Sequence, residues 1–332
     1  MNRKAGVLLM ATCVMLAGFA TSSVADDAAT QKAVLITGAS TGIGRNAAEK
    51  LAAEGYFVYA GARKAKDIEE LNKIENVMAV RLDVTSQDEI DAAVKLIEGE
   101  GRGLWGVVNN AGVNVVGPLI ELEESDLEFL FDVNIYGPYR VTRSFAPMII
   151  ESKGRIVNIS SISGTLSGPG YGIYSASKHA LEAFTDSLKR EMDELDVTVS
   201  AVEPGNYNSQ IGLTRCQRMV DESDETNYTY FEEYRLKALA RCKERLANGD
   251  GPGGAEPDRV AEAIQHALFD ENPKEHYLVV PNQDEARWTI TKAFEELLSL
   301  NQDHDYSYSR DELIAIMDEE WAHISGEKSE EE

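Results

Sequence analysis

Short apolar runs recur along the chain from residue 33 onward, and segments with helical spacing of apolar positions separate them. The runs are apolar at nearly every position, which is typical of strands buried on both faces. Seven strands are predicted in this way, at residues 33–37, 57–61, 78–82, 106–109, 156–159, 197–202 and 277–280. The segment 86–98 instead repeats apolar residues at spacings of three and four, as the buried face of a helix does.

Helix-end signals support this division of the chain. Ser86 precedes Glu89 by three residues, the spacing of a capping box, and Gly55 follows a predicted helix where glycine commonly ends one. Strands that alternate with helices predict an α/β fold. We expect a doubly wound, mostly parallel, seven-stranded sheet of Rossmann type with helices on both faces.

Two segments depart from this alternation. Residues 206–254 lose the regular pattern and end in a Gly-rich run, so they are interpreted as a lid within a domain of residues 32–282. Residues 283–332 are interpreted as an acidic, partly helical C-terminal extension, with a helix near 311–323. The lid contributes a candidate apolar wall, although its side chains could equally pack on the sheet: Ile211, Leu213, Met219, Tyr228, Tyr230 and Tyr234.

Residues 1–25 have the pattern of a targeting segment. A short basic head precedes an uncharged stretch at residues 5–20, and small residues at Ser23 and Ala25 precede two acids. This pattern predicts a signal peptide cut after Ala25 and an exported, periplasmic or secreted protein. The alternative is a retained membrane anchor, because the uncharged stretch extended to Val24 just suffices to span a bilayer.

Charge and cysteine content exclude several classes of protein. The 332 residues carry a net charge of −25, which would repel nucleic acid and anionic lipid over most of the surface. Three cysteines are too few for a disulfide-stapled scaffold and lack the spacing of a zinc knuckle, so no metal site is predicted. Cys216 and Cys242 could form a bridge across the lid in an oxidising compartment, but buried thiols are the favoured interpretation.

A glycine-rich loop after the first predicted strand indicates a dinucleotide site. Residues 37–44 lie between a strand and a helix, where backbone amides and the helix dipole can face a pyrophosphate. The candidate residues of this loop are Thr37, Gly38, Ser40, Gly42, Ile43 and Gly44. Three glycines alone would also fit an ordinary tight turn, so the position after a strand decides the interpretation.

The residues after the second and third strands bear on the cofactor. Where an acid would bind the ribose hydroxyl of NAD, the chain has Arg63, which suits the 2′-phosphate of NADP. NADP is therefore favoured over NAD. Asp83 ends the third strand and could meet the adenine, or could only cap the next helix. The run Asn109–Gly112 ends the fourth strand, and its two asparagines could meet the cofactor or only tie strand ends together.

A tyrosine and a lysine lie one helical turn apart. Tyr174 and Lys178 are at positions i and i+4 and project from the same helix face. Free tyrosine titrates near pH ~10, so an adjacent ammonium is needed for it to act as a base near neutrality. Ser160 and Ser161 follow the fifth strand, at the edge where open sheets bind ligands.

Taken together, these motifs resemble the short-chain dehydrogenase/reductase family over residues 32–282. The glycine loop, Asn109–Gly112, Asn134, Ser161, Tyr174, Lys178 and Pro204–Gly205 occur in the order and spacing of that family. The local sequences are most similar to the branch of retinol, 17β-hydroxysteroid and 3-hydroxybutyrate dehydrogenases. The resemblance implies dimers or tetramers formed through the helices on either side of the Ser161 strand.

The resemblance also implies a role for each residue. Tyr174 would exchange a proton with the substrate oxygen, Ser161 would hydrogen-bond that oxygen, and Asn134 would fix a water that links Lys178 to solvent. Lys178 would lower the pKa of Tyr174 and hold the nicotinamide ribose. Ser209 stands where the family commonly has threonine and keeps the hydroxyl. The remaining candidate cofactor residues are Asn110, Ala111, Gly112, Pro204 and Gly205.

These residues predict reversible hydride transfer between NADP or NAD and a small-molecule alcohol or ketone, apolar in the manner of a steroid or retinoid, or a hydroxy acid. The alternative is a non-catalytic nicotinamide-binding sensor or interaction module. Export conflicts with the scarcity of free nicotinamide cofactor outside the cytoplasm. Either the N-terminal segment anchors an enzyme that faces the cytoplasm, or the cofactor is bound before export.

Overall fold

The computed structural model describes residues 31–223, 226–249 and 253–325. The predicted leader at residues 1–25 lies outside this part of the chain. Seven strands form one sheet, and every neighbouring pair is parallel, so the sheet is wholly rather than mostly parallel. The strands are β1 (Ala33–Ile36), β2 (Phe57–Ala62), β3 (Val77–Arg81), β4 (Gly106–Asn109), β5 (Arg155–Ile159), β6 (Thr198–Pro204) and β7 (His276–Val279).

The strand order is β3-β2-β1-β4-β5-β6-β7, which is the doubly wound arrangement predicted from the sequence. The direction of winding reverses between β1 and β4. In such sheets, ligands bind beyond the carboxyl ends of the strands at this reversal.

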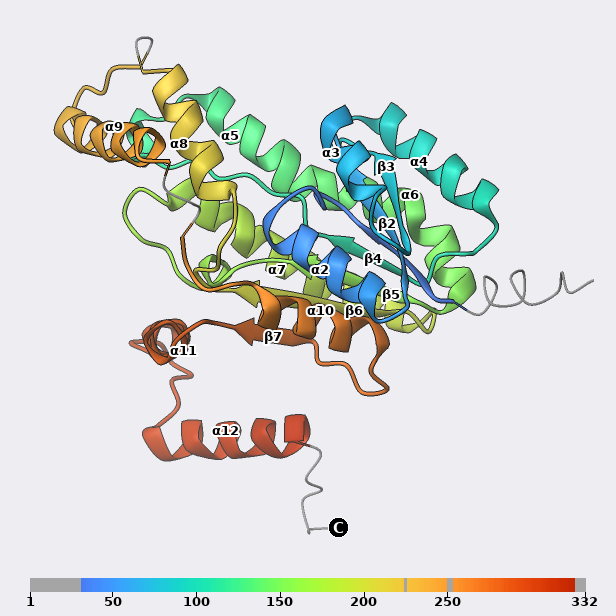
Figure 1. Ribbon diagram of the computed structural model, residues 1–332. Coiled ribbons are helices and arrows are strands. Elements are labelled where there is room, and N and C mark those ends of the chain that lie inside the picture. Colours follow the sequence, from blue (N-terminus) through green and yellow to red (C-terminus); the bar gives the residue numbers. More distant parts are fainter. Residues whose placement is uncertain (1–30, 224–225, 250–252, 326–332) are drawn as a thin grey trace, which may run out of the picture.

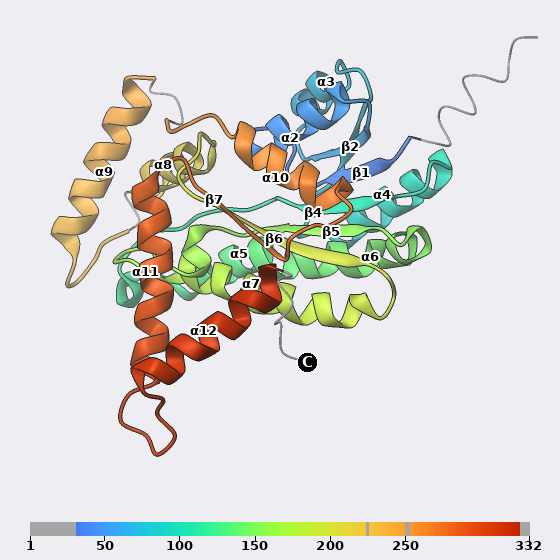
Figure 2. The ribbon, with the colours of Figure 1, turned by 90° about the horizontal axis from the view of Figure 1, so that it is seen from below.

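Helices cover both faces of the sheet, as Figures 1 and 2 show. The helices that connect and cover the strands are α2 (Gly42–Ala53), α3 (Ala65–Leu71), α4 (Gln87–Glu100), α5 (Glu124–Phe131), α6 (Gly137–Ser152), α7 (Gly172–Asp193) and α10 (Asp258–Phe269). Short turns η1 (Leu119–Glu121), η2 (Asp132–Tyr136) and η3 (Ile162–Gly164) join them, and η2 is a π-helical turn. Two further pairs of helices are α8 (Ile211–Asp221) with α9 (Glu232–Ala247), and α11 (Gln283–Leu300) with α12 (Arg310–Ser325).

Alternate residues of the strands build two cores. Val34 and Ile36 pack with the apolar faces of α2 and α10, while Leu35 packs with those of α4 and α6. Successive side chains of a strand point to opposite faces, so a strand that is apolar throughout supplies both layers. This burial of both faces explains why the strands could be recognised as uninterrupted apolar runs.

The predicted helix ends match the structure with one change. Ser86 accepts a hydrogen bond from the Glu89 backbone N–H, at 3.3 Å, as a capping box requires. The Glu89 carboxylate does not complete the box, because it accepts from the Asp83 backbone N–H instead, at 2.8 Å. The third strand is thereby tied to the helix that follows it. Gly55 has φ +90°, which is the left-handed conformation expected of a glycine after a helix.

The C-terminal helices lie apart from the sheet. Figures 1 and 2 show α11 beside the body and α12 standing off from it, and α12 has no buried residue. The predicted helix at 311–323 corresponds to α12. The start of α11 is anchored, however, because the buried Glu285 carboxylate accepts a hydrogen bond from the Asn206 backbone N–H, at 2.8 Å. Part of the extension thus contacts the loop after β6. Among the described residues, no helix is both long and apolar enough to cross a membrane.

Candidate active site

A cleft of about 940 Å³ opens at the carboxyl ends of the strands, where the strand order reverses. It brings together most of the candidate residues predicted from the sequence. Those that line it are Gly38, Ser40, Gly42, Ile43, Arg63, Asp83, Asn110, Ala111, Gly112, Ser161, Tyr174, Lys178, Pro204, Gly205 and Ser209. Thr37, Gly44 and Asn134 do not line the cleft, and each instead supports residues that do.

Thr37 holds two strand ends together. Its hydroxyl oxygen accepts hydrogen bonds from the backbone N–H groups of Asn110 and Ala111, both at 3.0 Å. The Asn110 side chain donates in return to the carbonyl oxygens of Thr37, at 2.8 Å, and Gly38, at 3.1 Å. The glycine loop is therefore fixed against the end of β4 by its own hydrogen bonds.

Two glycines of the loop are required by their surroundings. Gly38 has φ +64°, and a Cβ there would lie 2.9 Å from the Ala111 Cα. A Cβ on Gly44 would lie 2.3 Å from the Asn110 side-chain nitrogen. The loop is thus closed tightly against the β4 end while its outer side faces the cleft. A loop of this shape at the N-terminus of α2 fits the pyrophosphate of a dinucleotide.

Arg63 and Asp83 meet at the adenosine end of the predicted site. The Arg63 guanidinium lies 3.5 Å from the Asp83 carboxylate, and the Arg63 side chain is 60% exposed. Asp83 also accepts hydrogen bonds from the Thr85 backbone N–H, at 3.0 Å, and hydroxyl, at 2.8 Å. Burial alone would raise the pKa of Asp83, but the bonds from Thr85 and the Arg63 charge hold that pKa below its usual value. Asp83 therefore shapes the following turn as well as lining the cleft.

The neighbouring Asn109 has the structural role that the sequence left open. Its side-chain nitrogen donates to the hydroxyl of Thr142, at 3.0 Å, and to the side-chain oxygen of Asn158, at 2.8 Å. Asn109 is buried and points away from the cleft, so it ties β4 to β5 and α6.

Ser161 and Tyr174 face each other across the floor of the cleft. Ser161 lies two residues beyond the end of β5 and directly before η3. Its hydroxyl oxygen accepts a hydrogen bond from the Ser163 backbone N–H, at 3.1 Å. Burial raises the pKa of the Tyr174 phenol to about 12, the Ser161 hydroxyl opposes this rise by hydrogen bonding, and the nearby Tyr171 adds to it. The neighbouring Ser160 is buried, and its hydroxyl has no hydrogen-bond partner in the described part of the chain.

Lys178 is buried below Tyr174 on the same face of α7. Its Nζ lies 5.9 Å from the centre of the Tyr174 ring and donates a hydrogen bond to the Ile159 carbonyl oxygen, at 2.8 Å. Burial lowers the pKa of Lys178 to about 8, while the Glu182 carboxylate one turn further along opposes the change. The ammonium form is therefore easily gained and lost near neutrality.

Asn134 does not line the cleft but holds in place residues that do. It lies in the π-helical turn η2, where its side chain exchanges hydrogen bonds with the Val113 backbone at 2.9 and 3.0 Å. Its nitrogen also donates to the Ser177 hydroxyl at 3.1 Å, and Ser177 donates to the Tyr174 carbonyl oxygen at 2.7 Å. Asn134 thus fixes the loop after β4 to the helix that carries Tyr174 and Lys178.

The predicted lid consists of α8 and α9, which Figure 1 shows at one end of the molecule. A disulfide joins Cys216 of α8 to Cys242 of α9, so the favoured interpretation of two buried thiols was wrong. Both sulfurs are buried between the two helices, and proximity of this kind depends on how the helices pack, which spacing in the sequence does not reveal.

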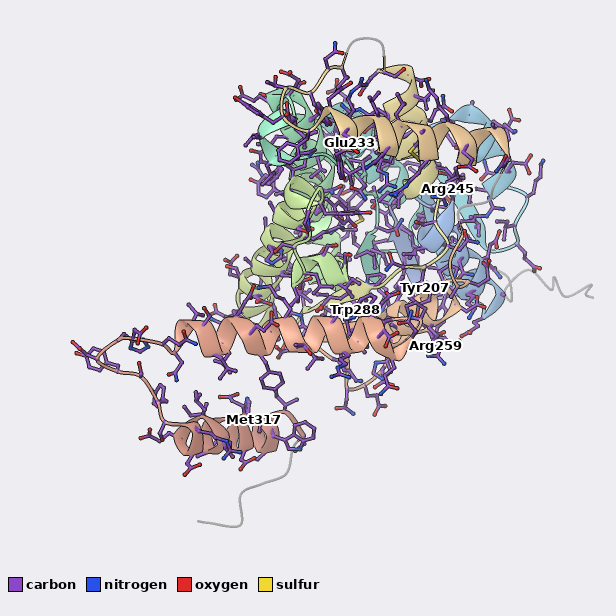
Figure 3. The ribbon with its side chains drawn as sticks, turned by 90° about the vertical axis from the view of Figure 1, so that its left-hand side faces the viewer. Tyr207, Glu233, Arg245, Arg259, Trp288 and Met317 are labelled. Carbon is purple, nitrogen blue, oxygen red and sulfur yellow. A yellow bond between two sulfur atoms is a disulfide. The ribbon has the colours of Figure 1, made fainter. Side chains whose placement is uncertain are left out.

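The lid presents more charge to the cleft than the sequence suggested. Ile211 lines the cleft, but Leu213 and Met219 do not. Three arginines of the lid line it instead, namely Arg215 and Arg218 of α8 and Arg245 of α9, and Figure 3 labels Arg245. Tyr171, at the start of α7, lines it as well. The three arginines were missed because only apolar and tyrosine side chains of the lid were predicted to form the wall, and none of the three tyrosines predicted for it lines the cleft.

A second group of charged side chains lies beside the cleft, where β6 and β7 pack on α7. His276 Nδ1 lies 3.0 Å from the Glu203 carboxylate and 3.5 Å from that of Glu182, while its Nε2 lies 3.1 Å from Asp186. Hydrogen bonds to Glu182 and Glu203 raise the pKa of His276 to about 10, against the effect of burial. The protonated imidazole therefore joins the helix of Tyr174 to the two strands nearest the lid.

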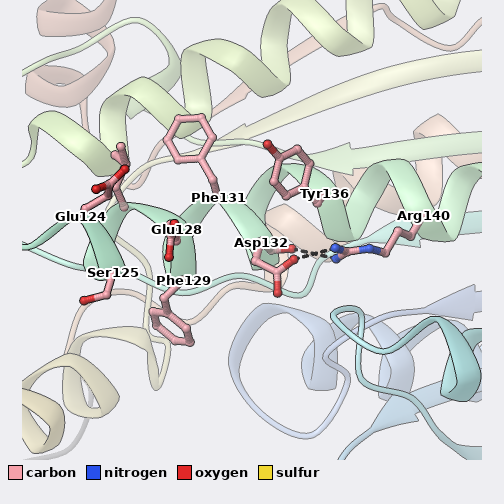
Figure 4. A pocket seen from close by; sticks show the side chains of 9 residues that line it. Glu124, Ser125, Glu128, Phe129, Phe131, Asp132, Tyr136 and Arg140 are labelled. Carbon is pink, nitrogen blue, oxygen red and sulfur yellow. Dashed lines mark hydrogen bonds and ion pairs between the residues drawn. The ribbon is translucent and has the colours of Figure 1, made fainter.

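A second pocket of about 700 Å³ lies against α5 and η2 and shares the Phe129 side chain with the cleft. Figure 4 shows its side chains and the ion pair between Asp132 and Arg140, which are 2.7 Å apart. The exposed aromatic side chains of Phe129 and Tyr136 line it. This pocket contains none of the residues predicted for catalysis.

Known proteins are similar to this chain in sequence and in fold. The short chain dehydrogenase family matches residues 32–218. The mitochondrial D-beta-hydroxybutyrate dehydrogenase of Bos taurus is 32% identical over 289 residues, which cover 82% of this chain and 84% of the relative. Retinol dehydrogenase 16 of Mus musculus is 36% identical over 255 residues, covering 74% and 80%. The crystal structure of a short-chain dehydrogenase from Streptomyces avermitilis matches with a TM-score of 0.65 and 28% identity, covering 82% of this chain and 96% of that one.

Proposed function

Since the chain belongs to the short-chain dehydrogenase/reductase family and is an NAD(P)-dependent oxidoreductase acting on CH–OH groups, we propose that Tyr174, Ser161 and Lys178 carry out its proton transfer. The observation that supports this assignment most strongly is that Ser161, Tyr174 and Lys178 line the same cleft, with the Ser161 hydroxyl close enough to lower the Tyr174 pKa and the Lys178 Nζ 5.9 Å from the Tyr174 ring. A substrate oxygen placed between the two hydroxyls would accept a hydrogen bond from each.

The cleft suits a nicotinamide dinucleotide. The glycine loop supplies backbone N–H groups at the N-terminus of α2, and Pro204 and Gly205 line the end of the cleft nearest Ser161. When bound, the nicotinamide accepts a hydride from the carbinol carbon or returns one to a carbonyl carbon.

The chain's own residues control the accompanying proton. In alcohol oxidation, Tyr174 takes the hydroxyl proton as its phenolate, and Ser161 donates a hydrogen bond to the oxygen as charge develops there. Burial raises the pKa of Tyr174 to about 12, so the phenolate needs a nearby positive charge. The Lys178 ammonium supplies it, and Asn134 keeps the helix of both residues in place through Ser177.

NADP is the proposed cofactor. Arg63 supports this choice, since its exposed guanidinium at the end of β2 makes a single long ion pair with the described residues, 3.5 Å from Asp83, and can turn to a 2′-phosphate. The affinities of the two reduced cofactors for the wild-type protein test it. Binding of NADPH at least tenfold tighter than NADH is expected, and the reverse order would assign NAD.

The substrate is an alcohol or its ketone, either apolar or a hydroxy acid. The names of the two relatives include one of each, a hydroxybutyrate and a retinol dehydrogenase. The proposal is tested by following the appearance of reduced cofactor with panels of both kinds of alcohol. No turnover with any alcohol, and none with the matching ketones in the reverse direction, would favour the alternative of a nicotinamide-binding sensor.

An exported location is proposed for the mature protein. The disulfide between Cys216 and Cys242 supports it, because disulfides persist in oxidising compartments. N-terminal sequencing combined with a count of free thiols tests the proposal. A start after Ala25 leaves only the bridged pair of the three cysteines and no free thiol. A retained N-terminus with three free thiols would place the protein in a reducing compartment.

Assembly through the helices around the Ser161 strand is proposed from the family resemblance. The apolar side chains exposed beside them, Phe129 and Tyr136 among them, support an interface on this side of the molecule. Light scattering is expected to give a dimer or tetramer, and a monomer at micromolar concentration would contradict it.

A further inference from the structure

Arg215 of the lid is a cation that faces the cleft and has no counter-ion among the residues that the structure describes. Its guanidinium is half-buried and donates one hydrogen bond, from Nη1 to the neutral hydroxyl of Tyr171, at 3.3 Å. Its Nε is buried and has no hydrogen-bond partner among the residues that the structure describes. A buried donor without a partner costs free energy, so a ligand that supplied the acceptor would be favoured there.

Arg218, about one turn further along α8, has carboxylate partners that neutralise its charge. Arg218 lies 2.5 Å from the Asp126 carboxylate of α5 and 2.8 Å from that of Glu222 at the end of α8, and the first of these pairs fastens the lid to α5. No carboxylate among the described residues lies within ion-pair distance of Arg215, although the protein has 57 acids and a net charge of −25. The positive charge of Arg215 is therefore available to an anion in the cleft.

Arg215 lies nearer to the residues proposed to contact the substrate than to the glycine loop proposed to bind the cofactor. Its partner Tyr171 precedes Tyr174 by three residues at the start of α7, and the Tyr171 hydroxyl is close enough to affect the Tyr174 pKa. The glycine loop, by contrast, contacts Ser209, which lies just before α8. A Cβ on Gly42 would be 3.1 Å from the Ser209 Cβ. Arg215 is thus more than one helical turn beyond that contact, on the side of the reacting hydroxyls.

We propose that Arg215 binds a carboxylate of the substrate, and that the substrates of this enzyme are hydroxy acids and the corresponding oxo acids. A guanidinium carries five N–H donors, of which Arg215 gives one to Tyr171, and a carboxylate can accept two parallel hydrogen bonds from the others. The carboxylate itself does not react. It orients the chain so that the carbinol oxygen reaches Tyr174 and Ser161, and this assignment rests on the hydride transfer proposed above.

The direct test compares hydroxy acids with their neutral methyl esters. Straight-chain acids with the hydroxyl at carbon two, three or four, together with their esters, serve as probes in the presence of NADP or NAD. For the acid that reacts best, the wild-type kcat/KM should exceed that of its ester by about 10- to 100-fold, as expected for a charged hydrogen bond. Arg215→Leu should lower kcat/KM for the acid by about the same factor and leave the ester within about twofold.

Two controls test whether the preference for acids comes from Arg215 and from the substrate part of the cleft. Arg241→Leu removes an exposed arginine of α9 that does not line the cleft, and acid preference should persist in that variant. The affinity of Arg215→Leu for the reduced cofactor should equal that of the wild type. A cofactor affinity lowered fivefold or more would assign Arg215 to the cofactor phosphates instead and overturn the proposal.

A binding measurement distinguishes a failure of the proposed anion site from a failure of the proposed hydride transfer. Calorimetric titration of the protein and reduced cofactor with butanoate, a carboxylate that cannot react, should show binding that Arg215→Leu abolishes. If butanoate binds in this way but no alcohol or ketone is turned over, the proposed reaction fails and the anion site stands. If esters are turned over as well as acids in the wild type, the anion site fails and the reaction stands.

Discussion

Lys178 donates a hydrogen bond to the carbonyl oxygen of Ile159, at 2.8 Å, and so joins the middle of α7 to the end of β5. Ser161 follows Ile159 by two residues, and Tyr174 precedes Lys178 by one helical turn. One hydrogen bond therefore joins the strand end and the helix that carry the two hydroxyls proposed to contact the substrate oxygen. The lysine has a structural role in the unliganded protein in addition to the electrostatic role proposed for it.

Cofactor affinity is expected to weaken as the pH rises through about 8. Burial lowers the pKa of Lys178 to about 8, so the side chain is an ammonium below that pH and a neutral amine above it. Only the ammonium attracts the electron-rich hydroxyls of the ribose that the lysine is proposed to hold. The dissociation constant of the reduced cofactor, measured between about pH 6.5 and pH 9.5 by fluorescence, should rise above about pH 8.

The variant Lys178→Met provides the comparison. It should bind the cofactor more weakly at every pH and show no change near pH 8, because the titrating group is gone. A wild-type affinity that stays constant across this range would show that the ammonium of Lys178 does not hold the cofactor.

The two adjacent serines should differ sharply in importance. Ser161→Ala removes the hydroxyl that contacts the Tyr174 phenol, and kcat should fall by about 10²- to 10³-fold with cofactor affinity unchanged. Ser160→Ala removes a buried hydroxyl that has no hydrogen-bond partner within the described ranges, so kcat should stay within about twofold of the wild type. Steady-state rates of both variants decide the assignment, and a larger loss in Ser160→Ala would transfer the role to that residue.

His276 should make stability depend on pH in a defined window. The pKa of His276 is raised from 6.5 to about 10 by hydrogen bonds to Glu182 and Glu203. A raised pKa in the folded state means that the stabilisation is fully present below about pH 6.5 and is lost as the pH rises through about 10. Because the side chain is 44% exposed, solvent reduces the size of the effect.

The variant His276→Gln isolates this contribution from other groups that titrate in the same range. The difference in urea midpoint between wild type and variant should be largest near pH 6 and should shrink steadily towards pH 10. A difference that grows with pH, or one that does not change, would contradict the charged bridge between α7, β6 and β7.

The sheet, and the meeting of the candidate catalytic residues in one cleft, could be predicted from the sequence because each depends on local features. Strands such as β1 are apolar at every position when both faces are buried, and the glycine loop needs φ +64° at Gly38, which few residues other than glycine adopt. Tyr174 and Lys178 share a helix face whatever surrounds them. The family resemblance added Ser161 and Asn134, whose roles depend on contacts distant in the sequence.

The lid could not be predicted in the same way. Whether Arg215 faces the cleft or solvent, and whether Cys216 meets Cys242, depends on how α8 and α9 pack on one another and on α5. Helical spacing does not determine that packing. The anchoring of α11 through Glu285 was missed for the same reason, since a buried acid within an acidic stretch looks like its solvated neighbours.

The central claim is that Tyr174 transfers the proton during hydride transfer. Tyr174→Phe removes only the phenolic oxygen, and the ring remains to pack over Lys178. The account predicts that this variant loses at least about 10³-fold in kcat on the alcohol that the wild type oxidises best, while the dissociation constant of the reduced cofactor changes by less than about threefold. Turnover of that alcohol at the wild-type rate would contradict it.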